Sequence, residues 1–190
     1  MRKGNLIVIS GPSGAGKGTL VARLIEEIPD AWVSISATTR KPRDGEIDGK
    51  NYFFYDKPQF MTRAEQDGFL EWAEYDGNCY GTPLDSVLEH IESGHQVILE
   101  IDVQGAFQVR DRMPEAKLVF IEPPSFEELE RRLRSRGTED EETVCRRLEA
   151  AKVELSRKNE YDIRLVNNDL EKALGELVAY VNELAGDTRG

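Results

Sequence analysis

Short apolar runs alternate along the chain with segments whose apolar residues recur every three or four positions. The runs are typical of buried strands in a parallel sheet and cover 6–9, 97–102, 118–121 and 163–166. The other segments predict helices at about 20–28, 87–93, 104–113 and 170–184. Together they predict an α/β fold with a parallel sheet flanked by helices.

The stretch 33–82 departs from this pattern. Trp32–Ser36 alternates like a half-buried strand, and a short helical segment surrounds Phe60. A glycine-rich turn over 77–83 closes the stretch, and Gly, Pro and Asp interrupt it too often for long helices. We expect a small mixed β subdomain inserted after the first helix.

Two arginine-rich helices are predicted between 125 and 150. Capping-box spacings at 125–128 and 138–141 mark their starts, and Gly137 separates them. Their arginines are residues 131, 132, 134, 136, 146 and 147. From spacing alone, a solvated face paired with glutamates explains them as well as a binding role does.

A phosphate-binding loop joins the first strand to the first helix. Its residues are Gly11, Pro12, Ser13, Gly14, Ala15, Gly16, Lys17, Gly18 and Thr19. Glycines allow successive N–H groups to point at phosphate oxygens, the helix N-terminus adds its dipole, and Lys17 reaches the outer phosphates. A turn that merely joins strand to helix is disfavoured, because motif and flanks agree.

Magnesium ligation is less well defined, because Gly18 occupies the position where Ser or Thr usually follows the lysine. Thr19 is the candidate metal ligand in the loop, with Glu100 as a second candidate near the end of the strand over 97–102. Whether these ligands are direct or water-mediated stays open.

Composition narrows the functional classes. The chain has 190 residues, 39% of them hydrophobic and 32% charged, which suits one soluble globular domain. The net charge of −11 argues against nucleic acid as a partner. No segment resembles a signal peptide or a membrane span, and Cys79 and Cys145 have no metal-binding spacing, so we expect free thiols and a cytoplasmic protein.

The chain resembles the guanylate kinase family over nearly its whole length. The motifs that carry the resemblance, in family order, are the phosphate loop, Thr38-Thr39-Arg40 with Pro42-Arg43, Leu70-Glu71-Trp72, Gly77-Asn78-Cys79-Tyr80-Gly81, Ile101-Asp102-Val103-Gln104-Gly105, Arg136-Gly137-Thr138 and Val166-Asn167-Asn168-Asp169. The resemblance implies a P-loop kinase core (about 1–32, 83–124 and 151–190), a GMP-binding subdomain at about 33–82 and a helical lid at about 125–150. It also implies the reaction ATP + GMP to ADP + GDP, with Mg²⁺ and a place in purine nucleotide metabolism.

The resemblance also implies roles for individual residues. The GMP site comprises Ser36, Arg40, Arg43, Tyr52, Glu71, Tyr80, Thr82 and Asp102. Arg40, Arg43 and the two tyrosines grip the phosphate, for which forked guanidinium donors and hydroxyls are suited. The others lie on the guanine and ribose side, and a carboxylate such as Glu71 can accept from guanine N1–H and the N2 amine together. For the tyrosines, core packing is the alternative.

For the ATP side, the resemblance implies that Arg132, Arg136 and Arg147 converge with Lys17 on the transferring phosphate, and that Asn167 lies near the adenine. A GMP phosphate oxygen is the nucleophile, so no side chain needs to attack, and His90 and His95 are expected to be structural or surface residues. Ala37 and Cys79 depart from the family pattern, which leaves the affinity for GMP open.

Two alternatives remain at the level of sequence. A guanylate-kinase-like module that binds protein partners and lacks catalysis would show an eroded phosphate loop or missing lid arginines. A P-loop kinase for another small acceptor is disfavoured by Glu71 and the Thr39-Arg40 turn. Oligomeric state and acceptance of dGMP stay open.

Overall fold

The computed structural model describes residues 2–135 and 140–186. Its central element is a five-stranded parallel sheet. In spatial order the strands are β2 (Ala31–Val33), β7 (Gln96–Glu100), β1 (Asn5–Ser10), β8 (Lys117–Glu122) and β9 (Ile163–Val166). The predicted α/β class with a parallel sheet is therefore confirmed.

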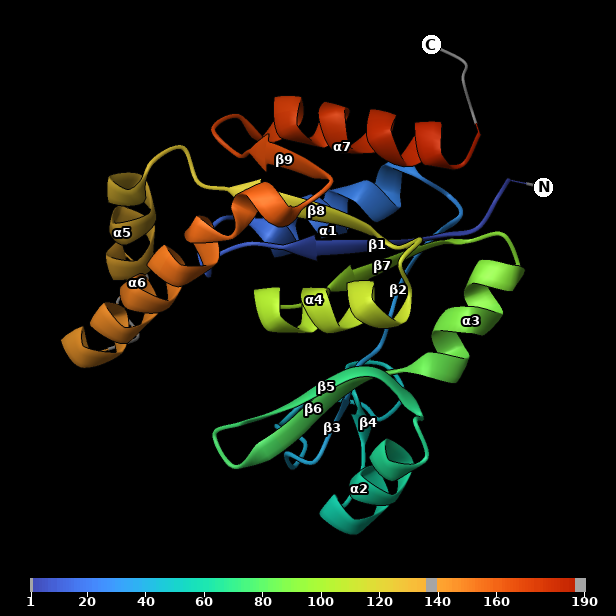
Figure 1. Cartoon of the computed structure of the whole chain (residues 1–190). Coiled ribbons are helices and arrows are strands. Elements are labelled where there is room, and N and C mark those ends of the chain that lie inside the picture. Colours follow the sequence, from blue (N-terminus) through green and yellow to red (C-terminus); the bar gives the residue numbers. More distant parts are fainter. Residues whose placement is uncertain (1, 136–139, 187–190) are drawn as a thin grey trace.

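Helices cover both faces of this sheet (Figure 1). One face packs on α1 (Lys17–Glu27) and α7 (Leu170–Leu184), and the other on α3 (Leu84–Glu92) and α4 (Val103–Arg112). Successive side chains of β1 point to opposite faces. Ile7 and Ile9 pack in the core beneath α1 and α7, and Leu6 and Val8 pack in the core beneath α3 and α4. The sheet is thus buried on both sides, which explains its nearly continuous apolar strands.

A second, four-stranded mixed sheet lies beyond α4 (Figure 1). Its order is β4 (Phe53–Phe54), β3 (Ala37–Thr38), β6 (Asn78–Pro83) and β5 (Phe69–Tyr75), with α2 (Lys57–Glu65) packed against it. Asp56 caps α2 through a reciprocal capping box with Gln59. Phe60 is fully buried and stacks on Phe69 with ring centroids 4.3 Å apart, so this sheet has a small core of its own.

Two details of the predicted strands are wrong. Trp32–Ser36 is not one strand: Ser34 N–H still donates to Ile98 O in the first sheet, whereas Ser36 O accepts from Phe53 N in the second. The chain changes sheets between these two residues. The turn predicted over 77–83 is mostly strand β6, and the turn itself is Asp76–Gly77, both with positive φ (50° and 73°), as a two-residue hairpin requires.

Two further helices project from one end of the first sheet (Figure 1). They are α5 (Phe126–Ser135) and α6 (Glu141–Ser156), which pack on each other through five buried residues and lead into the short helix η1 (Lys158–Glu160). Ser125 caps α5 as predicted, by accepting from Glu128 N–H. The predicted capping residue Thr138 and the turn at Gly137 lie outside the described residues, and the N-cap of α6 is Asp140, which accepts from Thr143 N–H.

Candidate active site

The phosphate loop lies between β1 and α1 and is shaped by three glycines with positive φ: Gly11, Gly14 and Gly16. A methyl group on Gly11 would lie 2.2 Å from Ile121 O, and one on Gly16 would lie 2.3 Å from Asn167 Nδ2. Gly11 therefore requires glycine for space as well as for backbone angle, whereas Gly16 requires it for backbone angle and a methyl there would displace the end of the Asn167 side chain. Within the loop, Lys17 Nζ donates to Gly11 O at 2.6 Å and to Pro12 O at 3.1 Å.

A basin of about 290 Å³ opens over this loop. Its lining includes Lys17, Gly18, Thr19 and, from the end of β7, Glu100. Gly18 leaves the space between loop and strand open, because a methyl there would already be within 3.6 Å of a Glu100 carboxylate oxygen. A hydroxyl and a carboxylate are hard oxygen ligands that suit Mg²⁺.

In residues 2–135 and 140–186, no group of three His, Cys, Asp or Glu side chains could hold a metal ion. Magnesium in phosphoryl-transfer sites is bound by one or two protein oxygens together with substrate phosphates and water. The donors in the basin, Thr19 and Glu100, fit that kind of site.

A neighbouring basin of about 410 Å³ shares Gly14, Gly16 and Thr19 with the first. It is lined by Gly14, Gly16, Thr19, Arg132, Ser135, Asn167, Asn168 and Leu170. The Asn167 amide donates to Ala15 O at 2.8 Å, so in this state it braces the loop. Its predicted place near adenine stays a prediction.

Two arginines, one from α5 and one from α6, lie near the phosphate loop. Arg132 Nε donates to Glu128 at 2.8 Å, and its Nη2 lies 3.4 Å from Asn167 O. Arg147 Nη1 lies 3.4 Å from Ser13 Oγ. Arg136 lies outside the described residues. Arg147 thus contacts the loop itself, whereas Arg132 contacts Asn167, whose amide is bonded to the loop.

The third cleft, of about 390 Å³, lies between the two sheets. Five of the eight predicted GMP residues line it: Ser36, Tyr52, Glu71, Tyr80 and Asp102. The sequence interpretation missed several others, of which Tyr75 at the exposed end of β5 and Ile101 after β7 are the largest. Glu100 lines both this cleft and the basin over the phosphate loop, so the two spaces adjoin.

Arg40 stands beside this cleft with its guanidinium 5.5 Å from the centre of the Tyr52 ring. Glu46 holds it through two hydrogen bonds of 2.8 and 3.0 Å and also accepts from Arg43 N–H at 2.8 Å. These bonds hold the pKa of Glu46 below its usual range. The role of Glu46 was not apparent from the sequence. The Arg43 residue is exposed and is not among the lining residues.

Glu71 is the buried carboxylate of the cleft. It is 8% exposed, and its Oε1 accepts from Thr82 Oγ1 at 2.7 Å. Thr82 is itself buried and lies behind Glu71, outside the lining of the cleft. Burial, followed by the charge of Asp102, raises the pKa of Glu71 to about 7, and the Thr82 bond opposes this only in part. Hydrogen bonding from Thr82 therefore favours the charged carboxylate too weakly to offset its burial.

A second carboxylate, Glu154 on α6, has a similar electrostatic position. Burial and the charge of Asp102 raise its pKa to about 7, whereas the charge of Lys17 lowers it. The charge of Glu154 therefore interacts with groups of both the phosphate loop and the cleft between the two sheets. Neither histidine lies near these groups: His90 stacks on Trp32 at 3.6 Å and contacts His95.

Comparison with known proteins identifies this arrangement. The family model described as guanylate kinase matches residues 3–184. The chain belongs to the guanylate kinase family. Its members are nucleoside monophosphate kinases, and their reaction transfers a phosphoryl group from ATP to GMP and yields ADP and GDP.

Individual relatives agree with this assignment. The guanylate kinase of Synechococcus sp. (strain CC9311) is 55% identical over 175 residues, covering 92% of each chain. That of Streptomyces coelicolor is 54% identical and covers 93% of this chain and 90% of its own. The crystal structure of guanylate kinase from Anaplasma phagocytophilum superposes with a TM-score of 0.77 at 33% identity, over 98% of this chain and 89% of that one.

The raised pKa of Glu71 predicts a pH dependence of stability. A carboxyl whose pKa is higher in the folded than in the unfolded state stabilises the fold at low pH and loses that contribution as the pH rises. Between pH 4.5 and about 8, the unfolding free energy of the wild type should fall relative to Glu71→Gln by on the order of 2–3 kcal/mol. Urea unfolding across this range measures it. Glu74→Gln, on the exposed part of β5, is the control, and a difference independent of pH would contradict the assignment.

Proposed function

We propose that the chain binds GMP in the cleft between the two sheets and ATP over the phosphate loop, and transfers the γ-phosphoryl group between them with Mg²⁺. The observation that carries this proposal is the shared wall: Glu100 lines both the cleft and the basin. An acceptor phosphate and a donor phosphate held in adjoining spaces can align for in-line transfer.

Recognition of guanine is assigned to Glu71, with Ser36, Asp102 and Thr82 as supporting residues. Guanine presents N1–H and an N2 amine side by side, and an ionised carboxylate accepts both. Adenine has no such pair of donors. Because these donors favour the charged carboxylate, GMP binding lowers the pKa of Glu71 and releases a proton from the fraction that is protonated near pH 7.

The acceptor phosphate is assigned to Arg40, Arg43, Tyr52 and Tyr80. Tyr52 and Tyr80 are neighbours, with ring centroids 6.3 Å apart, and Arg40 lies against the Tyr52 ring. The phosphate oxygens would compete with Glu46 for the same guanidinium. Two arginines with two hydroxyls supply permanent charge and directed donors without a further titrating group.

The donor phosphates are assigned to the loop over 11–19, with Lys17 and the arginines at 132, 136 and 147 around the group in transfer. Phosphate oxygens would replace the loop carbonyls that Lys17 now contacts. Thr19 and Glu100 would hold Mg²⁺, which would supply positive charge to offset the charge that develops during transfer. A GMP phosphate oxygen attacks, and the arginines exclude water as α5 and α6 close over the loop.

We also infer a cytoplasmic location. Both cysteines are unpaired, Cys79 buried and Cys145 exposed, which suits a reducing compartment. Among the described residues, no helix is long and apolar enough to cross a membrane.

The base assignment is tested by Glu71→Gln. The change keeps the size of the side chain, removes its charge and turns one oxygen into an NH₂ donor that faces a donor. It should cost GMP about 2–4 kcal/mol in kcat/KM, whereas AMP, which never made these bonds, should lose much less. Coupled assays of ADP formation with both acceptors decide it. An unchanged ratio of GMP to AMP would move the role to Ser36 or Asp102.

Lys17→Ala tests the assignment of the phosphate loop. Because the ammonium stabilises transferred charge, turnover should fall by several orders of magnitude while thermal stability without nucleotide stays close to the wild-type value. Single-turnover assays and thermal melts measure the two effects. Retention of more than about a tenth of the wild-type turnover, a loss of only ~1.4 kcal/mol, is incompatible with this role.

Arg147→Ala tests the proposed lid, with the neighbouring arginine as its control. Arg147 approaches Ser13 of the loop, whereas Arg146 is exposed and lies 3.1 Å from Thr143 Oγ1 within its own helix. Arg147→Ala should lower kcat about a hundredfold and leave GMP affinity without ATP unchanged, and Arg146→Ala should change neither much. If calorimetric titration shows GMP affinity falling as far as kcat, Arg147 belongs to the acceptor site.

A further inference from the structure

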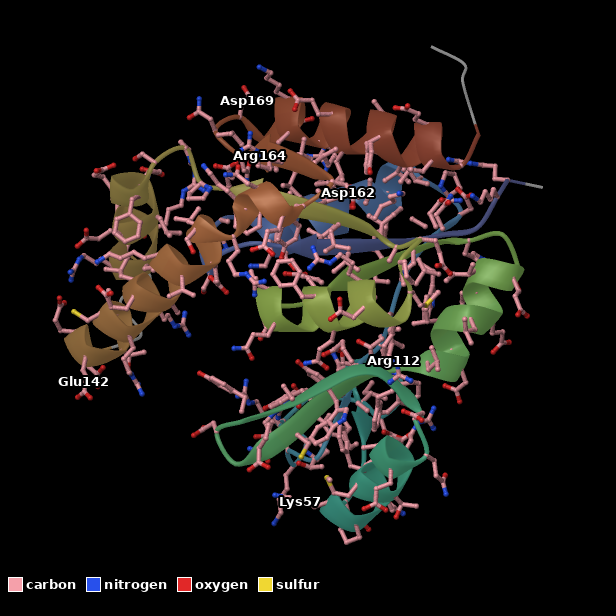
Figure 2. All side chains as sticks on the ribbon, viewed as in Figure 1. Lys57, Arg112, Glu142, Asp162, Arg164 and Asp169 are labelled. Carbon is pink, nitrogen blue, oxygen red and sulfur yellow. The ribbon has the colours of Figure 1, made fainter. Side chains whose placement is uncertain are left out.

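One face of α4 lies along strand β5, which carries Glu71. Asp102 caps the helix by accepting from Gly105 N–H at 2.8 Å. One turn further, Gln108 Oε1 accepts from Trp72 N–H at 3.2 Å. At the end of the helix, Arg112 Nη1 donates to Phe69 O at 2.5 Å. Arg112 is labelled in Figure 2. Residues 102, 105 and 108 are three apart, so they face the strand together.

Gly105 lies on this face close to the Glu71 carboxylate. A methyl group on Gly105 would lie 3.1 Å from Glu71 Oε2 and 3.4 Å from its carboxyl carbon. The other carboxylate oxygen, Oε1, accepts from Thr82 Oγ1 at 2.7 Å. The carboxylate is therefore confined between a hydroxyl and a bare Cα.

The backbone gives no reason for a glycine at this position. Gly105 lies within α4 and is not among the residues with positive φ. Alanine is the better helix former, and its N–H would still reach Asp102. What glycine supplies here is the absence of a side chain.

Strand β5 cannot readily retreat from a larger residue. Its backbone is fixed to α4 on both sides of Glu71, through Trp72 N–H and Phe69 O. A side chain at 105 would also meet Ile101 Cδ1 at 3.2 Å. The displacement would therefore fall on the carboxylate, whose paired hydrogen bonds to a base depend on direction as well as distance.

We propose that Gly105 is a specificity-determining positioning residue: its missing side chain leaves the space in which the Glu71 carboxylate is held toward the acceptor base. The inference rests on the proposed role of Glu71. Gly105 acts through Glu71 and does not itself touch the substrate.

The test is Gly105→Ala, with Gly175→Ala as the matched control. Gly175 lies within α7, and a methyl there would meet nothing within 4 Å. Gly105→Ala should lower kcat/KM for GMP about tenfold or more, mainly through KM, and should narrow the ratio of GMP to AMP. The KM for ATP should not change. The control should leave all these values as in the wild type.

A double-mutant cycle with Glu71→Ala separates the proposal from its premise. With the carboxylate gone, Gly105→Ala should have no further effect on the GMP-to-AMP ratio. An equal loss in both backgrounds, or wild-type GMP kinetics in Gly105→Ala, overturns the role of Gly105. If Glu71→Ala alone leaves the ratio unchanged, the base assignment fails and the proposal fails with it.

Folding is controlled separately. If thermal melts show Gly105→Ala to be destabilised, the cycle is repeated with Ile101→Val present in all variants. That change removes Ile101 Cδ1, which is among the nearest contacts of the new methyl group, and retains the contact with Glu71. A GMP-to-AMP ratio restored to that of Ile101→Val alone would show that the effect came from packing against Ile101 and would overturn the proposal.

Discussion

Electrostatic repulsion between two phosphate groups is the constraint on which the arrangement of this molecule depends. The chain carries a net charge of −11, so its field opposes both nucleotides. The cations around the clefts are already held by acceptors of the protein: Lys17 by loop carbonyls, Arg40 by Glu46 and Arg132 by Glu128. Long side chains are thus ordered before a phosphate arrives, and part of the entropy cost of binding is met by the fold.

The proposed GMP site has a different electrostatic problem, which is the burial of a carboxylate. Glu71 is buried where its charge is poorly stabilised, and hydrogen bonding from Thr82 offsets the burial only in part. A packed hydrophobic residue would suit the empty protein better, so in our proposal this position sacrifices stability for selectivity. In our proposal the base donors complete the environment of the carboxylate, which makes the cleft unfavourable for any ligand that lacks them.

Most elements of the core could be predicted from the sequence because their signals are local. The apolar runs of β1, β8 and β9 and the one-sided face of α7 need no knowledge of their neighbours. Trp32–Ser36 failed because its alternation fits two different sheets, and only the partner strands decide where one ends. The hairpin at Asp76–Gly77 carried a usable signal, since Asp-Gly favours this turn, but the glycines around it obscured the strand.

The same distinction between local signals and contacts of distant segments applies to the candidate site. Motifs resembling a known family located residues from distant parts of the chain, and the structure brings five of the proposed GMP residues to one cleft. Glu46 lies outside these motifs, and the motif at 101–105 contains Gly105 without revealing its role, because neither residue has a chemistry that its own sequence context reveals. Glu46 becomes informative only when Arg40 lies 2.8 Å away, and Gly105 only when Glu71 from another sheet lies against its Cα. Contacts between distant segments thus position the groups that local motifs supply.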